Sequence, residues 1–209
     1  MQIRNAVSPR EAKSFDTAQL RDAFLVTDLF KPGEVVMTYS HVDRIIVGSA
    51  VPQGKTLELS GGQEIAADSF LERRELGLIN IGSAGTVSVD GQEMALQARD
   101  GLYVGRGAKE IKMASADKND PARFYFLSAP AHASYPTKKI SLAEAKPVHL
   151  GERKDSNVRT IHQYVHPAVL ESCQLVMGMT ILEAENVWNT MPTHTHDRRM
   201  EVYLSLIHI

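Results

Sequence analysis

The sequence predicts a mainly β protein, arranged as an antiparallel sandwich or barrel, and three observations lead to this fold class. Short runs rich in β-branched and aromatic residues recur at regular spacing along the 209 residues. An Asp90-Gly91 pair between two such runs is typical of a two-residue hairpin turn. One short segment near the amino terminus, by contrast, has the apolar spacing of a helix.

The predicted elements follow one another with recognisable starts. Asp16 and Thr17 can cap a short helix over residues 18–25, whose apolar side chains fall on one side. After Pro32-Gly33 the sequence becomes β-rich, because β-branched and aromatic residues dominate the successive runs. Strands are predicted over residues 35–39, 44–48, 76–81, 86–89, 93–96, 101–105 and 123–127.

Residues 130–147 interrupt this pattern and are predicted to form a linker. Within it, Ser141 and Glu144 have the spacing of a capping box, which indicates a single helical turn. Another β-rich run, residues 174–182, opens a second region. We therefore expect an N-terminal domain over residues 1–140 and the start of a second domain over residues 141–209.

Composition and charge exclude several classes of protein. A net charge of −2 and a pI of about 6.4 favour neither a nucleic-acid surface nor an anionic membrane as partner. Cys173 is the one cysteine, so no intramolecular disulfide can form, which fits a reducing compartment. The charged first 16 residues are unlike a signal peptide, and no apolar run approaches the ~20 residues of a membrane span. We expect a cytoplasmic protein.

Residues 193–203 (THTHDRRMEVY) have the side chains of a metal site. On a β-strand, residues two apart face the same side, so His194 and His196 can point at one ion. A bend at the polar residues 197–199 then allows Glu201 to return as a carboxylate ligand. Two imidazoles and a carboxylate suit zinc, iron(II), manganese or nickel, and leave positions open for substrate. An ordinary exposed strand bearing two histidines is the alternative.

A degenerate internal repeat relates the two regions. Residues 72–76 (ERREL) align with residues 197–201 (DRRME) at an offset of 125 residues. The first region then lacks ligands where the second has them, since the histidines and the glutamate are replaced by Ser69, Leu71 and Leu76. The repeat predicts two related domains, of which the first binds no metal.

The His194-x-His196-x4-Glu201 motif within short strands resembles the cupin family of small β-barrels. Trp188 stands where the cupin pattern has a glycine. In the first half, residues 105–110 (GRGAKE) are similar to the second cupin motif, with Glu110 in place of its histidine. The first region therefore resembles a metal-free cupin, and the two together a bicupin.

Longer motifs resemble the 4-deoxy-L-threo-5-hexosulose-uronate ketol-isomerase family, also called 5-keto-4-deoxyuronate isomerases, of bacterial pectin breakdown. They occur in order at residues 40–48 (SHVDRIIVG), 70–77 (FLERRELG), 135–139 (YPTKK) and 188–192 (WNTMP). The resemblance implies a homohexameric bicupin that converts 5-dehydro-4-deoxy-D-glucuronate to 3-deoxy-D-glycero-2,5-hexodiulosonate, an aldose–ketose isomerisation.

The same resemblance implies one zinc ion per subunit, held in the second barrel by His194, His196, Glu201 and a histidine further downstream. That fourth histidine has no counterpart here, and the family pattern ends after Leu204. We therefore expect a C-terminally truncated chain with an incomplete second barrel, inactive by itself.

Further roles are less defined. Arg198 and Arg199 could bind the substrate carboxylate, although a solvated connection between strands explains at least one of them equally well. The sequence identifies no general base. Two other functions remain open, an iron(II) dioxygenase built on the same three ligands and a non-catalytic sugar-binding cupin.

Overall fold

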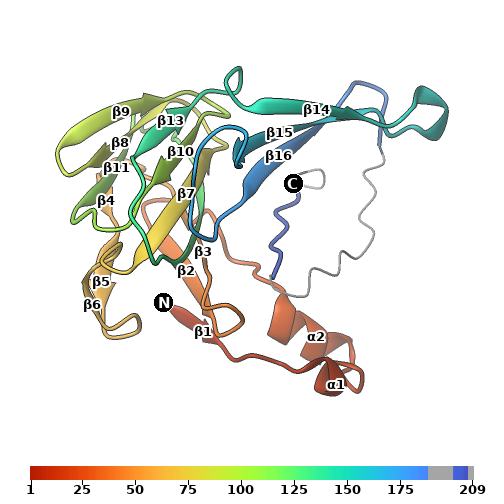
Figure 1. Ribbon diagram of the computed structural model, residues 1–209, viewed down its shortest axis with the longest axis horizontal. Helices are drawn as coiled ribbons and strands as arrows, with labels where there is room; N and C mark the ends of the chain where they lie inside the picture. The colour runs from red at the N-terminus through yellow and green to blue at the C-terminus, as the bar shows by residue number, and fades with distance from the viewer. Residues whose placement is uncertain (188–199, 207–209) are drawn as a thin grey trace.

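The computed structural model describes residues 1–187 and 200–206 of the chain (Figure 1). Strands dominate this part of the protein, which confirms the prediction of a mainly β fold. Its helical elements are short: α1 (Pro9–Ala12), α2 (Thr17–Phe24) and the 3-10 turn η1 (Arg153–Asp155). None of the helices in the described residues is long and apolar enough to cross a membrane.

Helix α2 begins where its capping residues predict. The Asp16 carboxylate accepts a hydrogen bond from the Gln19 backbone N–H (2.8 Å), and the Gln19 side chain accepts one from the Asp16 N–H (2.9 Å). This reciprocal pair satisfies two helix-end donors. The apolar side of α2 is not buried, because Leu20 is 40% and Phe24 58% exposed.

The largest sheet has seven strands in the order β1-β2-β3-β12-β7-β10-β13. Strands β1 and β2 run parallel, and the other neighbours in this sheet run antiparallel. In sheet order, the strands are β1 (Gln2–Arg4), β2 (Val35–Ser40), β3 (Ile46–Ala50), β12 (Phe124–Pro130), β7 (Arg74–Asn80), β10 (Gly101–Val104) and β13 (Lys138–Ile140).

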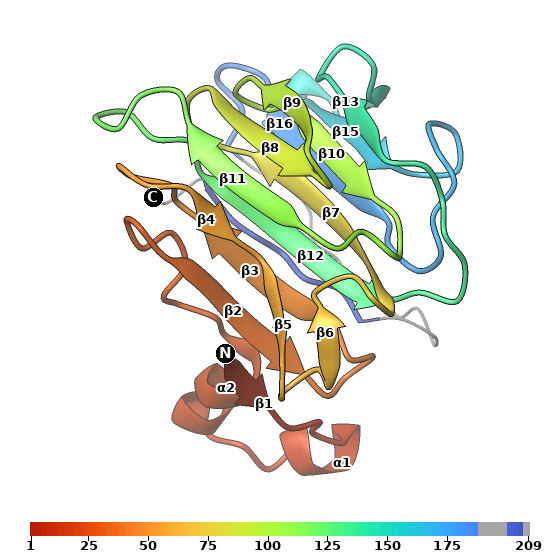
Figure 2. The same ribbon diagram turned by 90° about the vertical axis from the view of Figure 1, so that its left-hand side faces the viewer.

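A four-stranded antiparallel sheet faces one side of the large sheet (Figure 2). It consists of β4 (Leu57–Glu58), β11 (Ile111–Ser115), β8 (Gly85–Val89) and β9 (Gln92–Leu96), with the small hairpin of β5 (Ser60–Gly62) and β6 (Ala67–Ser69) beside it. The turn between β8 and β9 is the predicted one. Asp90 (φ 48°) and Gly91 (φ 84°) both adopt left-handed conformations, as a type I′ hairpin requires.

The space between these two sheets is filled by a first apolar core. Alternate residues of β7, Leu76 and Leu78, point into it from the large sheet, and Val87 and Met113 enter from the opposite one. Leu71, just before β7, is fully buried in the same core. The internal repeat aligns Leu71 and Leu76 with two predicted metal ligands of the second region. Both leucines are packed core residues.

The other face of the large sheet is covered by the second region of the chain. Its three strands, β14 (Lys146–Leu150), β15 (Arg159–Val165) and β16 (Met177–Leu182), form one antiparallel sheet beside the first region (Figure 1). A second apolar core lies between them, in which Ile79, Tyr103 and Tyr125 of the large sheet meet Tyr164 and Met177. The central strands of the large sheet, β3, β12, β7 and β10, are therefore buried on both faces.

The predicted linker over residues 130–147 needs correction. Lys138–Ile140 forms β13, which pairs with β10 at the edge of the large sheet. Lys139 also forms an ion pair with Asp100, at 3.0 Å. Backbone pairing with β10 and this ion pair together hold β13 at the sheet edge, although two of its three residues are lysines. The helical turn predicted at Ser141 is present, since the Ala145 N–H donates to the Ser141 carbonyl (3.1 Å); of the capping box, the Glu144 half forms, with the Ser141 N–H and hydroxyl both donating to the Glu144 carboxylate at 2.8 Å.

Replacing Leu71 by alanine should lower the free energy of unfolding by about 2–5 kcal/mol, because it removes a fully buried side chain and leaves a cavity. Chemical denaturation of the chain measures this. Val187→Ala, at a side chain that is 79% exposed, should change the same free energy by less than about 0.5 kcal/mol. Equal effects of the two substitutions would contradict the packing described here.

Candidate metal-binding segment

Of the three predicted metal ligands, one lies within the described residues and two lie outside them. Glu201 is described and exposed to solvent. The other predicted site residues lie outside the described residues: His194, His196, Arg198 and Arg199. The geometry of the candidate site is therefore built from Glu201 and its surroundings.

Residues 200–205 alternate between half-buried and exposed, as the residues of an extended strand do. Met200, Val202 and Leu204 are half-buried and pack against the second core. Glu201 and Tyr203 alternate with them and are exposed, because successive side chains of an extended chain point to opposite sides. The apolar side of the segment thus fixes which way the Glu201 carboxylate faces.

A hydrogen bond holds the Glu201 side chain. The Tyr203 hydroxyl donates to Glu201 Oε2 over 2.6 Å. This bond to a carboxylate, with partial burial, raises the pKa of Tyr203 above its usual value, so the phenol stays a donor at neutral pH. Residues two apart on a strand share a face, so the spacing alone would have suggested this pair, which the sequence analysis missed.

A turn of the first region holds the start of this segment. Asp43 Oδ2 accepts a hydrogen bond from the Met200 backbone N–H over 2.8 Å, across 157 residues of sequence. Asp43 (φ 51°) and Arg44 (φ 53°) both adopt left-handed conformations between β2 and β3. That turn also explains why β3 begins at Ile46 rather than at the predicted residue 44.

The donor chemistry of the segment fits a metal ion. Glu201 supplies a carboxylate on the side away from the packed core, and the sequence supplies two imidazoles five and seven residues before it. Carboxylate and imidazole are ordinary ligands of divalent zinc. Within residues 1–187 and 200–206, no other group of three or more His, Cys, Asp or Glu side chains is placed to hold an ion.

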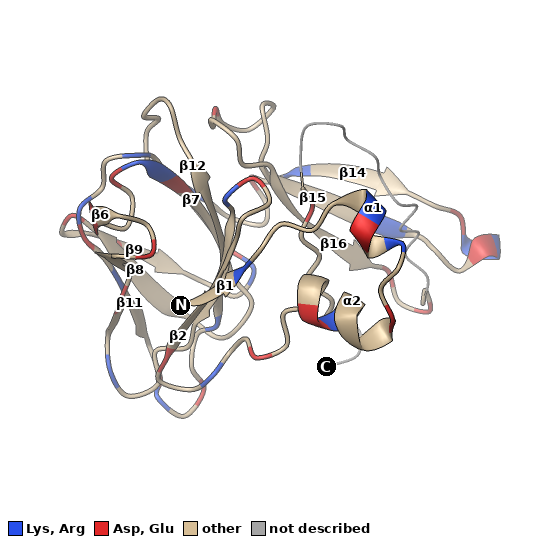
Figure 3. Cartoon of the chain, turned by 90° about the horizontal axis from the view of Figure 1, so that it is seen from below, with Lys and Arg blue, Asp and Glu red and all other residues tan. Residues whose placement is uncertain are grey.

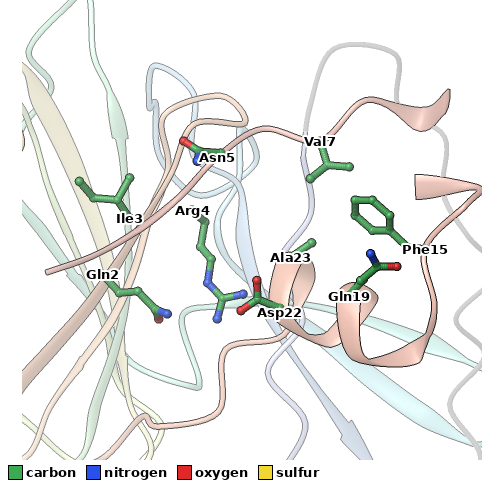
Figure 4. Close-up of a pocket in the computed structure, with 9 residues that line it drawn as sticks. All are labelled: Gln2, Ile3, Arg4, Asn5, Val7, Phe15, Gln19, Asp22 and Ala23. Carbon is green, nitrogen blue, oxygen red and sulfur yellow. The ribbon is translucent and has the colours of Figure 1, made fainter. Parts of the chain in front are cut away.

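A separate cleft of about 300 Å³, with both polar and apolar lining residues, lies between β1 and α2 (Figure 4). Arg4 lines it and donates from Nη2 to the Leu25 carbonyl (3.0 Å), which ties the end of α2 to β1. Asp22 and Gln19 face the cleft from α2 (Figure 4). The cleft was not foreseen from the sequence, because it forms only where the helices meet the strand.

Comparison with known proteins gives the family. The model of the KduI/IolB family matches residues 24–207. A 4-deoxy-L-threo-5-hexosulose-uronate ketol-isomerase of Caldicellulosiruptor bescii is 55% identical over 97% of this chain and 74% of its own length. Proteins of the same name from Lachnoclostridium phytofermentans and Escherichia coli O8 are each 54% identical, over 98% and 97% of this chain and 74% of their own lengths.

The identity extends along nearly the whole chain, so it does not depend on one shared motif. It confirms the resemblance to ketol-isomerases that the four sequence motifs predicted. The chain belongs to the KduI/IolB family.

Proposed function

We propose that this protein is the aldose–ketose isomerase that converts 5-dehydro-4-deoxy-D-glucuronate to 3-deoxy-D-glycero-2,5-hexodiulosonate in uronate catabolism. The observation that carries this proposal is identity above 50%, over nearly the whole chain, to relatives named as that ketol-isomerase. The dioxygenase and sugar-binding alternatives have no such support.

The reaction moves a proton from a carbon next to one carbonyl to a neighbouring carbon. A divalent ion, when bound, supplies positive charge that favours the loss of this proton. We infer that His194, His196 and Glu201 hold the ion, and that zinc is the metal. Tyr203 keeps the Glu201 carboxylate in one orientation through the 2.6 Å hydrogen bond. Arg198 and Arg199 are candidates for binding the substrate carboxylate.

We further propose a bicupin organisation, with a metal-free cupin over residues 1–140 and a metal-binding cupin that begins at residue 141. The solid apolar core of the first region supports this division, because Leu71 and Leu76 occupy the interior positions that the repeat equates with ligands. Elemental analysis should then find one zinc per subunit. Two ions per subunit, or iron in place of zinc, would contradict this part of the proposal.

A homohexamer in the cytoplasm is the proposed state of the protein. The apolar side chains exposed on α2, among them Leu20 and Phe24, support subunit contacts that would remove them from water. The free Cys173 suits a reducing compartment. Light scattering coupled to size-exclusion chromatography tests the assembly, and a monomer at micromolar concentration would exclude it.

Replacing His194 or His196 by alanine, in the product of the complete gene, should reduce turnover of the uronate by more than ~100-fold. Each imidazole is a direct ligand, and even the loss of an outer supporting group costs up to about that factor. The exposed His132 provides the control, since His132→Ala should keep full activity. Near-normal turnover by either ligand variant would disprove the metal assignment.

Replacing Tyr203 by phenylalanine should weaken zinc binding by about 10–100-fold, because Glu201 loses the hydroxyl that orients it. Competition with a chromophoric chelator measures the dissociation constant. Tyr125→Phe is the matched control: its buried hydroxyl has no hydrogen-bond partner among the described residues. Equal zinc affinity of Tyr203→Phe and the unmodified protein would show that Glu201 needs no such support.

A further inference from the structure

Glu75 is a charged residue in the middle of a buried strand. It lies on β7 between Arg74 and Leu76, points to the second core rather than the first, and has no exposed surface. In Figure 3, basic and acidic residues lie next to one another at the start of β7. A carboxylate taken out of water is strongly destabilising unless hydrogen bonds replace the lost hydration, so its partners determine whether it can be tolerated.

Four donors satisfy this carboxylate. Glu75 Oε1 accepts from the backbone N–H groups of Gln174 (2.6 Å) and Leu175 (2.8 Å). Oε2 accepts from the Cys173 N–H (2.8 Å) and from the Tyr103 hydroxyl (2.7 Å). Burial, together with the bond to Glu75, raises the pKa of Tyr103, so the phenol remains a donor. No lysine or arginine of the described residues forms an ion pair with Glu75.

Three of these donors are consecutive amides of a distant segment. Residues 173–175 lie about 100 positions further along the chain and lead directly into β16. A run of backbone N–H groups around one carboxylate is an anion-binding nest, here occupied by a side chain of the same protein. The segment is thus bound to the first region through its backbone.

Glycines beside Glu75 allow the second region to come this close. A Cβ on Gly77, two residues along the same face of β7, would lie 3.2 Å from Met177 Sδ and 3.6 Å from Leu175 Cδ1. A Cβ on Gly101 of the neighbouring β10 would overlap the ring of Tyr164, at 2.6 Å from Cδ1. The large sheet therefore carries a docking surface made of Glu75, Gly77 and Gly101.

The same core receives the candidate metal-binding segment. Leu175 and Met177 are buried members of the second core, and Met200, Val202 and Leu204 pack against it. A shift of residues 173–177 would therefore move the surface on which the Glu201 segment lies. Because close-packed interiors transmit small displacements, this shared core is a physical route from the amides of residues 173–175 to the Glu201 segment.

We propose that Glu75 is a positioning residue: its carboxylate fixes residues 173–175 and, through the second core, sets the place of Glu201 in the metal site. This role rests on the proposed function for its metal-binding part. The docking of residues 173–175 by the Glu75 carboxylate is independent of that function and is tested without metal.

Glu75→Gln is the decisive substitution, because it keeps the size of the side chain, removes its charge and replaces one of the two acceptor oxygens by an NH2 donor. Amide hydrogen exchange, followed by mass spectrometry on the metal-free protein, should show at least ~100-fold faster exchange in residues 173–175, since charge-assisted hydrogen bonds are lost. Peptides from β12 should exchange as before. Glu93→Gln, an exposed glutamate on β9, is the matched control and should change neither.

Zinc affinity is the second measurement. Glu75→Gln should weaken zinc binding by at least ~10-fold in protein that remains folded. Tyr103→Phe removes one hydrogen-bond donor of four, so it should change the zinc affinity and the exchange rate of residues 173–175 less than Glu75→Gln does. If Glu75→Gln does not fold, Tyr103→Phe decides, with faster exchange confined to residues 173–175 as the supporting result. Uniformly faster exchange with unchanged zinc affinity would overturn the positioning role and leave Glu75 a structural residue. Unmodified protein that binds no zinc would disprove the proposed metal assignment, while the exchange data would still decide the docking.

Discussion

Burial of the central strands of the seven-stranded sheet on both faces is the constraint on which the rest of the structure depends. Antiparallel sheets commonly leave one face in water, but here every residue of β7 is buried. One face closes the first core, and the other receives Tyr164, Val165, Leu175 and Met177 of the second region. The second region therefore completes the burial of the first, and the two regions share one packed interface rather than a flexible link.

Burial of all of β7 also buries its polar side chains, and each of them forms hydrogen bonds. Arg74 donates to the Ser128 side chain and carbonyl and to the Arg44 carbonyl, over 2.7–3.1 Å. Burial lowers the pKa of Arg74 to about 10, which still leaves it protonated at neutral pH. Asn80 bonds the backbone of two adjacent turns, accepting from the Gly82 and Arg123 N–H groups. Together with Glu75, these residues fix β7 at both of its ends.

The candidate metal-binding segment is positioned by contacts with the first region and with the second core. The backbone of Met200 is held by Asp43, and the apolar residues of the segment rest on the second core. Glu201 consequently faces away from the packed interface, with Tyr203 as its neighbour. The proposed role of Glu201 as a metal ligand needs such support, because a ligand must be held in place before the ion binds. The first region thus supplies both the Asp43 contact and part of the core on which this segment rests.

The sequence by itself determined the features that depend on neighbouring residues. The Asp16 capping box, the Asp90-Gly91 turn and the helical turn at Ser141 follow from local backbone preferences, and most strands follow from runs of β-forming side chains. The family followed from ordered motifs, and the metal prediction from the chemistry and spacing of its ligands, which the described structure leaves as a prediction for His194 and His196. Tertiary structure alone decided the strand at Lys138–Ile140, the carboxylate nest at Glu75 and the Asp43–Met200 contact. In each of these the partner lies tens to more than a hundred residues away, and no local pattern states which distant group will satisfy a buried charge.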